Sequence, residues 1–430
     1  MNHNTKNVKI AAISEKTLIV GIDVGSEMHF ARIFDWRQYE YSKKPFAFSN
    51  NENGFVSFRE WVDDFKVKNG KEDVFAAMEP TGHYWFNLGK FLQDSGMKLV
   101  HVNPHHVRKT RELDDNNPNK NDRKDPRVIA GLVTEGRYNR PYIPEGVYAE
   151  LRSLSNLRLQ TQEEVTRIKN RIARWFSIYF PEYRDVYRKP DAVTGIAVLK
   201  QAPLPEDITK LGVEGILKIW REKKLRGAGE KRARTLLSAA ERSIGSREAS
   251  DAARIEIGNL LTDYEVFAGR SEDLLGRIEE KLQEIPHIEK LMEVRGIGIK
   301  TVSVAAAEIG DIGRFDNAKQ LQKLAGLAIV SNDSGKHNGE SRISYRGRKR
   351  LRYALYEMAL SVVGKNTDFR ELYRYYIERP KNPLKKMQAL IAVSCKLIRV
   401  LYAILTKGVT YDGTKMLGDI HRPEAYTQAG

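Results

Sequence analysis

Four carboxylates, spread over three separate segments, are of a type and order suited to binding divalent metal ions. Asp23 lies in the apolar run "IVGIDVG", where an uncompensated charge is costly to bury, and Glu79 ends the apolar run "AAMEPTG". Asp122 and Asp125 in "NDRKDPRVIAGL" are three residues apart, which puts both on one face if the segment is helical. Mg²⁺ prefers oxygen ligands, and two such ions can activate the attacking and leaving oxygens of a phosphodiester. The four residues therefore predict a two-magnesium site for phosphodiester chemistry.

Each carboxylate also has a purely structural interpretation. Asp23 can cap a turn, and Glu79 can interact favourably with the dipole of a helix that follows Pro80. Asp122 and Asp125 can be solvated loop charges. The order of all four along one β-rich region favours catalysis over four separate structural roles.

A serine followed by a cluster of cations is suited to attack on a phosphate. Ser334 precedes a glycine in "SNDSGKHNGESRISYRGRKRLR", and Ser331 is a weaker candidate in the same segment. A serine hydroxyl needs a base, a metal or charge stabilisation to act as a nucleophile. Guanidinium groups match phosphate oxygens, so we expect nucleic-acid contacts from the basic residues that follow: Arg342, Arg346, Lys349, Arg348 and Arg350. The alternative is a polar turn with solvated basic neighbours.

A pair of glycines just upstream is a further candidate for phosphate contact. The segment "LMEVRGIGIKTVSVAAAEIGD" predicts two helices joined at Gly296 and Gly298, an arrangement that resembles a helix-hairpin-helix. Glycine amides can approach a phosphate closely because no side chain intervenes. A tight helix turn explains the same glycines almost as well.

The elements expected to carry the carboxylates form an α/β domain over residues 18–145. Strands are predicted in "TLIVGIDVG", "VFAAM" and "KLVHVN", with a helix that starts at Pro80 and Thr81 and stops at Gly96. This alternation predicts a mixed sheet covered by helices. We expect three histidines to lie in loops that face the acidic site or nucleic acid: His101, His105 and His106.

The rest of the chain is predicted to be mainly helical. Two heptad seams in residues 146–286 predict long helices with coiled-coil character, which pair either within one chain or between two chains. The first seam runs from Leu151 to Trp175 and the second from Ile257 to Ile278, with a small helical insert between them. Residues 287–415 are expected to form a mainly α C-terminal domain, with tails at 1–17 and 416–430.

Charge and composition favour a nucleic-acid partner. The 430 residues carry a formal net charge of +16, which suits contact with phosphates. The single cysteine, Cys395, excludes a disulfide framework within the chain. No secretory signal is recognised, and the apolar run "MQALIAVSCKLIRVLYAIL" carries Lys396 and Arg399, which predicts a buried helix instead of a membrane span. We therefore expect a cytoplasmic, nucleoid-associated protein without a membrane partner.

Several of these motifs, in this order, resemble one known family. The segments "GIDVGSEMHF", "MEPTGHY", "VNPHHVRKTR" and "NDRKDPRVIAGL" resemble the RuvC-like half of the DEDD transposases of bacterial insertion sequences, of the IS110 type. The segment "LAGLAIVSNDSGKHNGESRISYRGRKRLRYAL" resembles the serine-containing half of the same transposases. The resemblance covers nearly the whole chain, and it implies an RNase-H-like N-terminal domain.

The resemblance also implies a mechanism and partners. Asp23, Glu79, Asp122 and Asp125 would bind Mg²⁺, and Ser334 would attack DNA at the element ends and at a target. A structured RNA encoded by the element would guide the enzyme, and the two halves, from different subunits of a homo-oligomer, would form a composite site. Two features depart from the family pattern. Members often carry a double serine or a double glycine around the nucleophile, whereas here Asp333 precedes Ser334 and Lys336 follows Gly335. Pro126 follows Asp125, where a helix former is more usual.

Two other functions are compatible with parts of this pattern. A metal-dependent junction resolvase needs only the RuvC-like half, and Ser334 would then play no part. A non-catalytic nucleic-acid-binding scaffold needs only the positive charge. Covalent attachment of DNA to the serine distinguishes the recombinase from both.

Overall fold

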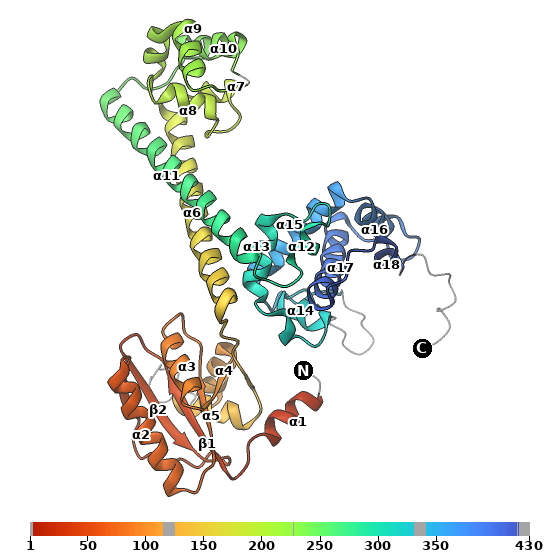
Figure 1. The fold of residues 1–430 in the computed structure, drawn as a ribbon. Coiled ribbons are helices and arrows are strands. Elements are labelled where there is room, and N and C mark those ends of the chain that lie inside the picture. Colours follow the sequence, from red (N-terminus) through yellow and green to blue (C-terminus); the bar gives the residue numbers. More distant parts are fainter. Residues whose placement is uncertain (1–2, 115–124, 227, 331–340, 419, 421–430) are drawn as a thin grey trace. The chain divides into compact units, whose positions relative to one another are not determined.

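The computed structural model of the chain describes residues 3–114, 125–226, 228–330, 341–418 and 420. The chain divides into two units, residues 1–143 and residues 144–430 (Figure 1). Each unit has its own hydrophobic core, so each is described by itself.

The first unit is built on a six-stranded mixed sheet. Its strand order is β3-β2-β1-β4-β5-β6, in which β1, β4 and β5 are parallel to one another and the remaining pairs are antiparallel. The bounds are β1 Thr17–Asp23, β2 Met28–Phe34, β3 Phe46–Ser49, β4 Asp73–Met78, β5 Lys98–Val102 and β6 Tyr138–Asn139. The mixed sheet expected for this region is confirmed.

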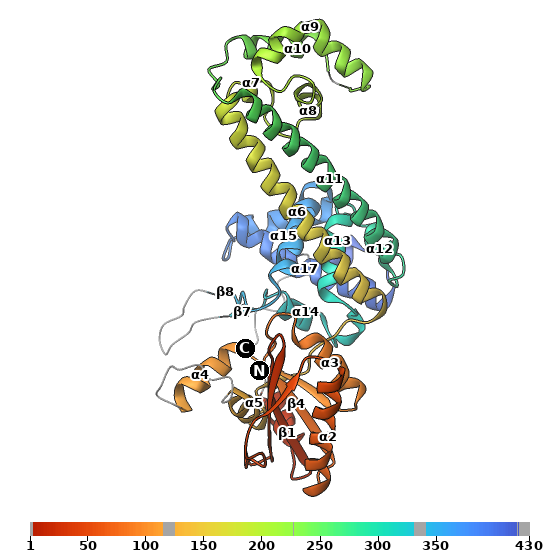
Figure 2. The same cartoon turned by 90° about the vertical axis from the view of Figure 1, so that its left-hand side faces the viewer.

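Helices cover both faces of this sheet (Figure 2). Alternate residues of β1 face opposite ways: Leu18, Val20 and Ile22 share a core with α2 (Glu52–Lys68) and α3 (Trp85–Asp94). Ile19 shares the other core with α4 (Pro104–Asp114) and α5 (Asp125–Thr134). The helix α1 (His3–Ala11) occupies part of the expected N-terminal tail and contacts β6, because the Tyr138 hydroxyl donates to the Lys9 carbonyl (3.0 Å).

The prediction for the start of α3 was wrong by several residues. The helix begins at Trp85, after Pro80 and Thr81. Gly82 has a φ of 55°, a left-handed conformation that cannot continue a right-handed helix. The predicted stop is confirmed, since α3 ends at Asp94 and Gly96 follows with a φ of 75°.

The close approach of α5 to β1 depends on Gly21. A Cβ atom built on Gly21 would lie 1.9 Å from the carbonyl oxygen of Pro126, a separation that no side chain can occupy. Pro126 is the second residue of α5, where its missing N–H costs no hydrogen bond. The amino end of α5 therefore lies directly on β1, two residues before Asp23.

Two long helices form an antiparallel hairpin in the second unit. They are α6 (Gly146–Tyr179) and α11 (Ser250–Leu282), which pair within one chain. Near one end the Trp175 indole N–H donates to the Ala253 carbonyl (3.0 Å), and in the middle the Gln162 amide donates to the Ser271 hydroxyl (2.6 Å). Residues from the two predicted seams are buried, including Ile168 of α6. The polar pair of Gln162 and Ser271 interrupts this row of buried residues in the middle of the hairpin.

Four helices, which we call the helical cap, are inserted between α6 and α11. They are α7 (Tyr183–Val186), α8 (Val193–Leu199), α9 (Pro205–Glu222) and α10 (Glu230–Glu241). Aromatic side chains from the end of α6 and from the cap fill a common core, which includes Trp175, Phe176 and Trp220. The Trp220 indole N–H donates to the Thr194 carbonyl (2.8 Å), which fixes α8 against α9.

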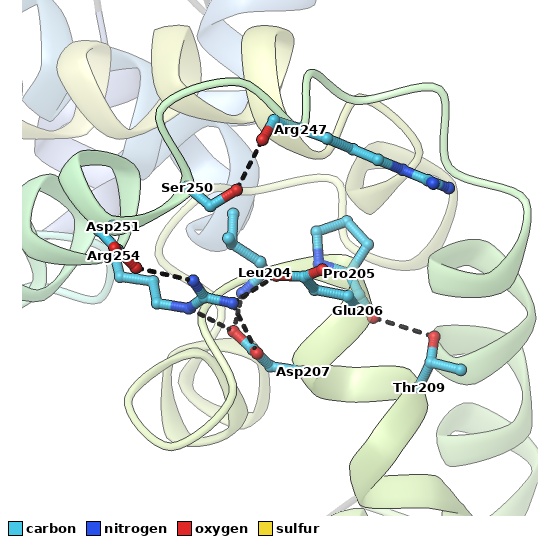
Figure 3. A network of polar contacts seen from close by, with 9 residues as sticks. All are labelled: Leu204, Pro205, Glu206, Asp207, Thr209, Arg247, Ser250, Asp251 and Arg254. Atoms are coloured by element: carbon cyan, nitrogen blue, oxygen red, sulfur yellow. Dashed lines mark hydrogen bonds and ion pairs between the residues drawn. The ribbon is translucent and has the colours of Figure 1, made fainter.

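Ion pairs from one arginine of α11 connect the hairpin to the start of α9 (Figure 3). The Arg254 guanidinium donates to both carboxylate oxygens of Asp207, at 3.0 and 2.9 Å, and also pairs with Glu206 and Asp251. Asp207 accepts in addition from the Leu204 backbone N–H (3.2 Å). A fork of this kind fixes orientation as well as distance.

The remaining helices of the second unit share one apolar core. They and the short strands among them are α12 (Ile288–Met292), α13 (Ile299–Ile309), η1 (Ile312–Arg314), α14 (Ala318–Leu324), β7 (Ile329–Val330), β8 (Arg342–Ile343), α15 (Lys349–Lys365), α16 (Thr367–Glu378), α17 (Lys386–Lys407) and α18 (Gly413–Leu417). Within the described ranges, α17 is the one helix long and apolar enough to cross a membrane. Its residues Val393, Leu397 and Leu401 are buried in the core, as expected for a core helix.

We predict that His101 makes the first unit sensitive to acid. The three histidines do not lie in loops as expected: His101 lies in β5, and His105 and His106 lie in the first turn of α4. The Trp85 ring meets His101 edge to face, with centroids 4.3 Å apart. Burial lowers the pKa of His101 from 6.5 to about 4. The unfolded chain therefore takes up the proton first, so the contribution of His101 to the free energy of unfolding is constant above pH 7 and falls between pH 6.5 and pH 4, by about 1–3 kcal/mol.

Urea unfolding of the wild type and of His101→Gln at neutral and acid pH tests this. The difference in unfolding free energy between the two proteins should shrink toward pH 4, because the variant has no group to protonate at this position. An equal acid dependence in both proteins would contradict the prediction.

We also predict that Gly21→Ala destabilises the first unit by roughly 3 kcal/mol, because the added methyl group meets a backbone carbonyl instead of a flexible side chain. Thermal unfolding measures this loss. The matched control is Gly269→Ala in α11, where no described atom beyond the local helix backbone lies within 4 Å of the added carbon. That control should be neutral or slightly stabilising, since alanine favours helix. Equal melting temperatures for the two variants would count against the contact.

Candidate active site

Asp23 and Glu79 lie side by side at the carboxyl ends of two parallel strands. Asp23 is the last residue of β1, and Glu79 directly follows Met78, the last residue of β4. The register pairs Ile22 with Met78, so the next residue of each chain segment is a carboxylate. Parallel strands place their functional residues at this edge of a sheet.

The strand pattern places both carboxylates on the face that α5 covers. Ile19 of β1 and Phe75 and Ala77 of β4 belong to the core beneath α5. Because side chains alternate along a strand, Asp23 and Glu79 continue that face. The first residue of α5 is Asp125, which is 4% exposed. Three of the four predicted carboxylates thus come from elements that meet at one edge of the sheet, while Asp122 lies outside the described residues.

The donor chemistry of this site fits magnesium. Carboxylate oxygens are the ligands that Mg²⁺ prefers. In the part of the chain that the structure describes, no three His, Cys, Asp or Glu side chains are grouped closely enough to hold a metal ion. Asp122 lies outside that part, so the described carboxylates alone do not form a complete metal-binding group.

A buried histidine, His29, accepts a hydrogen bond from the turn that follows Asp23. The Gly25 backbone N–H donates to His29 Nδ1 (3.3 Å), while the Asn50 side-chain amide donates to the Ser26 carbonyl (3.0 Å). The Asn50 backbone N–H also donates to the Glu27 carbonyl (2.8 Å). Burial lowers the pKa of His29, which favours the neutral imidazole that can accept from Gly25.

His29 is not among the residues that the sequence predicts for this site. The available signal was a histidine in an otherwise apolar strand pattern, a few residues after the candidate aspartate. A position of that kind is compatible with any buried polar role. Its connection to the turn requires the pairing of β1 with β2, which only the folded chain shows.

The second set of candidates belongs to the C-terminal half. The short strands β7 and β8 pair Ile329 with Ile343 and Val330 with Arg342. Ser331 and Ser334 lie in the segment that joins these strands, outside the described residues. The paired strands bring the two ends of that segment together.

Two glycines, Gly326 and Gly347, allow the backbone segments before β7 and after β8 to contact each other closely. A Cβ atom on Gly347 would lie 2.4 Å from the Gly326 backbone nitrogen and 2.5 Å from the Leu324 carbonyl oxygen. Gly326 has a φ of 70°, and its carbonyl accepts from the Tyr345 N–H (3.1 Å). The Arg348 N–H donates to the Leu324 carbonyl (2.7 Å). These backbone contacts explain the glycines of "LAGLA" and "YRGRK", which the sequence analysis left without a role.

The cations of this region are not equivalent. Arg342, Arg346 and Lys349 are exposed. Arg348 instead donates to the Glu308 carbonyl and lies 3.4 Å from a Glu308 carboxylate oxygen; burial is the main cause that lowers its pKa. Arg350, also exposed, donates to the Asn156 side chain of α6. The structure thus gives Arg348 and Arg350 internal partners.

The two hairpin glycines also differ from each other. Gly296 has a φ of 99°, and its Cβ position lies 2.8 Å from Val362 Cα of α15, so packing within the unit requires this glycine. Gly298 precedes α13 as its N-cap residue, and no atom lies within 4 Å of its Cβ position. Of the two, Gly298 has the open surroundings that a ligand would need.

Two family models match separate parts of the chain. A family model for DEDD transposases of the IS110 type, described as "Transposase", matches residues 20–181. A second, described as "Transposase IS116/IS110/IS902 family", matches residues 288–374. Together the two ranges span more than half of the chain. The DEDD match implies an RNase-H-like fold for the first unit, which accords with its mixed central sheet.

Proteins of three insertion elements are similar along most of the chain. The IS116 uncharacterized 44.8 kDa protein of Streptomyces clavuligerus is 24% identical over 90% of this chain and 94% of its own length. The IS900 uncharacterized 42 kDa protein of Mycobacterium paratuberculosis is 25% identical over 68% of this chain and 73% of its own. The IS110 uncharacterized 43.6 kDa protein of Streptomyces coelicolor is 23% identical over 76% and 80%. With both family matches in chain order, the chain belongs to the IS110 family of insertion-sequence transposases.

Proposed function

We propose that this transposase cuts and rejoins DNA through a covalent serine intermediate. Ser334 is the proposed nucleophile, and Asp23, Glu79, Asp122 and Asp125 are the proposed magnesium ligands. The observation that carries the acidic half of the proposal is the parallel register of β1 and β4, which makes Asp23 and Glu79 neighbours at the sheet edge above α5.

The proposed step exchanges one phosphodiester for another. A bond forms between Ser334 Oγ and the scissile phosphorus, and the bond from phosphorus to the 3′ oxygen breaks. The hydroxyl proton lost from the serine is balanced by a proton taken up at the 3′ oxygen. The bond energy is kept in the phosphoserine link, so a 3′ hydroxyl can reverse the step on another end.

The chain's own residues supply charge and position for this step. The bound ions would stabilise charge on the phosphate oxygens when present. Asp23 is held by β1 and by the turn that His29 supports, and Asp125 by the contact of α5 with Gly21. On the serine side, Arg342 begins β8 and Arg346 follows this strand; both are exposed and suited to phosphate contact.

The proposed partners follow from the family and from charge. A transposase acts on DNA, here at element ends and at a target. Guidance by a structured RNA encoded by the element, and a homo-oligomeric assembly, are proposals that rest on the resemblance. The net charge of +16 supports a nucleic-acid partner without specifying RNA.

We predict that Ser334→Ala abolishes covalent attachment of DNA. The full-length protein is incubated with element-end DNA, the adjacent noncoding RNA and Mg²⁺, and the products are separated on a denaturing gel. Wild type should give a protein–DNA adduct that mass analysis maps to Ser334, and the variant should give none, because the bond to phosphorus requires that oxygen.

Ser331→Ala is the matched control and should retain the adduct. Asp23→Asn should reduce adduct formation by orders of magnitude while DNA binding is retained, since it removes a ligand charge and little volume. Cleavage that is equal in wild type and Ser334→Ala, with no adduct in either, would indicate a metal nuclease. An Asp23→Asn protein with full activity would contradict the acidic site.

A further inference from the structure

The loop between α9 and α10 concentrates positive charge on the helical cap. Residues 218–234 contain eight Lys or Arg and two Glu, so this short stretch supplies six of the chain's sixteen net positive charges. A solvated helix surface more often mixes both signs. An excess of this kind in one short stretch indicates attraction to a polyanion.

Each of the two acidic residues of this stretch forms an ion pair with a cation in its own helix. Glu222 lies 4.0 Å from Lys218, and Glu230 lies 2.5 Å from Arg234, both with the spacing of neighbours on a helix. Arg232 lies over the Tyr187 ring, 5.9 Å from its centroid. The loop itself contributes three cations, Lys223, Lys224 and Arg226, and no acidic residue.

The three loop cations, Lys223, Lys224 and Arg226, are exposed around an anchored backbone. The Lys224 N–H donates to the Arg221 carbonyl (3.0 Å) and the Leu225 N–H to the Trp220 carbonyl (3.0 Å). The Leu225 side chain packs against the core of the cap. The loop thus directs one residue inward and its charged neighbours outward.

The backbone at Lys224 is unusual for a lysine. Its φ is 51°, a left-handed conformation that glycine or asparagine adopts at lower cost. Such strain is common at functional positions. Lys224 directly follows Lys223, and both side chains are exposed.

The cap also lies apart from the regions with an assigned role. Both family matches, residues 20–181 and 288–374, leave the loop out. Along α6, Leu151 belongs to the core of the C-terminal helices and Ile168 to the core of the cap, which separates the two cores by about 25 Å at 1.5 Å per residue.

We infer that the helical cap binds the phosphate backbone of duplex DNA through Lys223, Lys224 and Arg226. Ammonium and guanidinium groups that contact phosphates release counterions from the duplex, and such contacts carry no base specificity. Duplex DNA is the occupant because the chain belongs to a family that acts on DNA. The inference rests on that function and is independent of the serine chemistry.

The test compares full-length proteins in binding to labelled DNA at several salt concentrations. In the variant Lys223→Gln, Lys224→Asn and Arg226→Gln, asparagine suits the left-handed position, so the loop should keep its backbone. Affinity should fall equally for element-end and scrambled duplexes, and the slope of log K against log salt should become shallower by about 3. Melting temperature should be unchanged.

The matched control is Lys43→Gln, Lys44→Gln and Arg59→Gln, which removes the same charge from exposed positions of the first unit. It should keep the wild-type slope and adduct yield. An equal loss in both triple variants, or in neither, would overturn the inference, because net charge alone would then explain binding. A loss seen with duplex RNA and not with DNA would overturn it too. A missing Ser334 adduct would count only against the proposed chemistry, since this readout is binding.

Discussion

The contact between the Pro126 carbonyl and the bare backbone of Gly21 is the constraint on which the sheet unit depends. It places the amino end of α5 on β1 at a separation that excludes any side chain. Since Asp125 precedes Pro126 and Asp23 follows Gly21 by two residues, one backbone contact fixes the positions of two carboxylates. The third, Glu79, needs no such contact, because the β1–β4 ladder already places it.

A similar contact is found at the base of the serine segment. Gly326 and Gly347 allow the end of α14 and the start of α15 to meet backbone to backbone, and the β7–β8 pairing continues from there. In both halves, glycine removes a side chain so that two chain segments can approach, and the candidate chemical groups follow within a few residues. Backbone contacts of this kind position groups more firmly than flexible side chains do.

The second unit separates two hydrophobic cores along a hairpin. The C-terminal helices pack on one end of α6 and α11, and the cap packs on the other. The bidentate pair of Arg254 with Asp207 fixes the first turn of α9 relative to α11. A surface on the cap is therefore separated along the hairpin from the core of the C-terminal helices.

The sequence by itself determined the element types and the candidate chemistry. Alternating apolar strands, the long helical seams and the order of Asp23, Glu79 and Asp125 are local or periodic features, and local features can be read from one chain. Tertiary structure alone decided which residues meet. The late start of α3 after Gly82, the burial of Arg348 against Glu308, the packing role of Gly296 and the support of the Asp23 turn by His29 all depend on contacts between distant segments. Composition and spacing do not reveal such contacts, because the contacts form only when all the elements pack together.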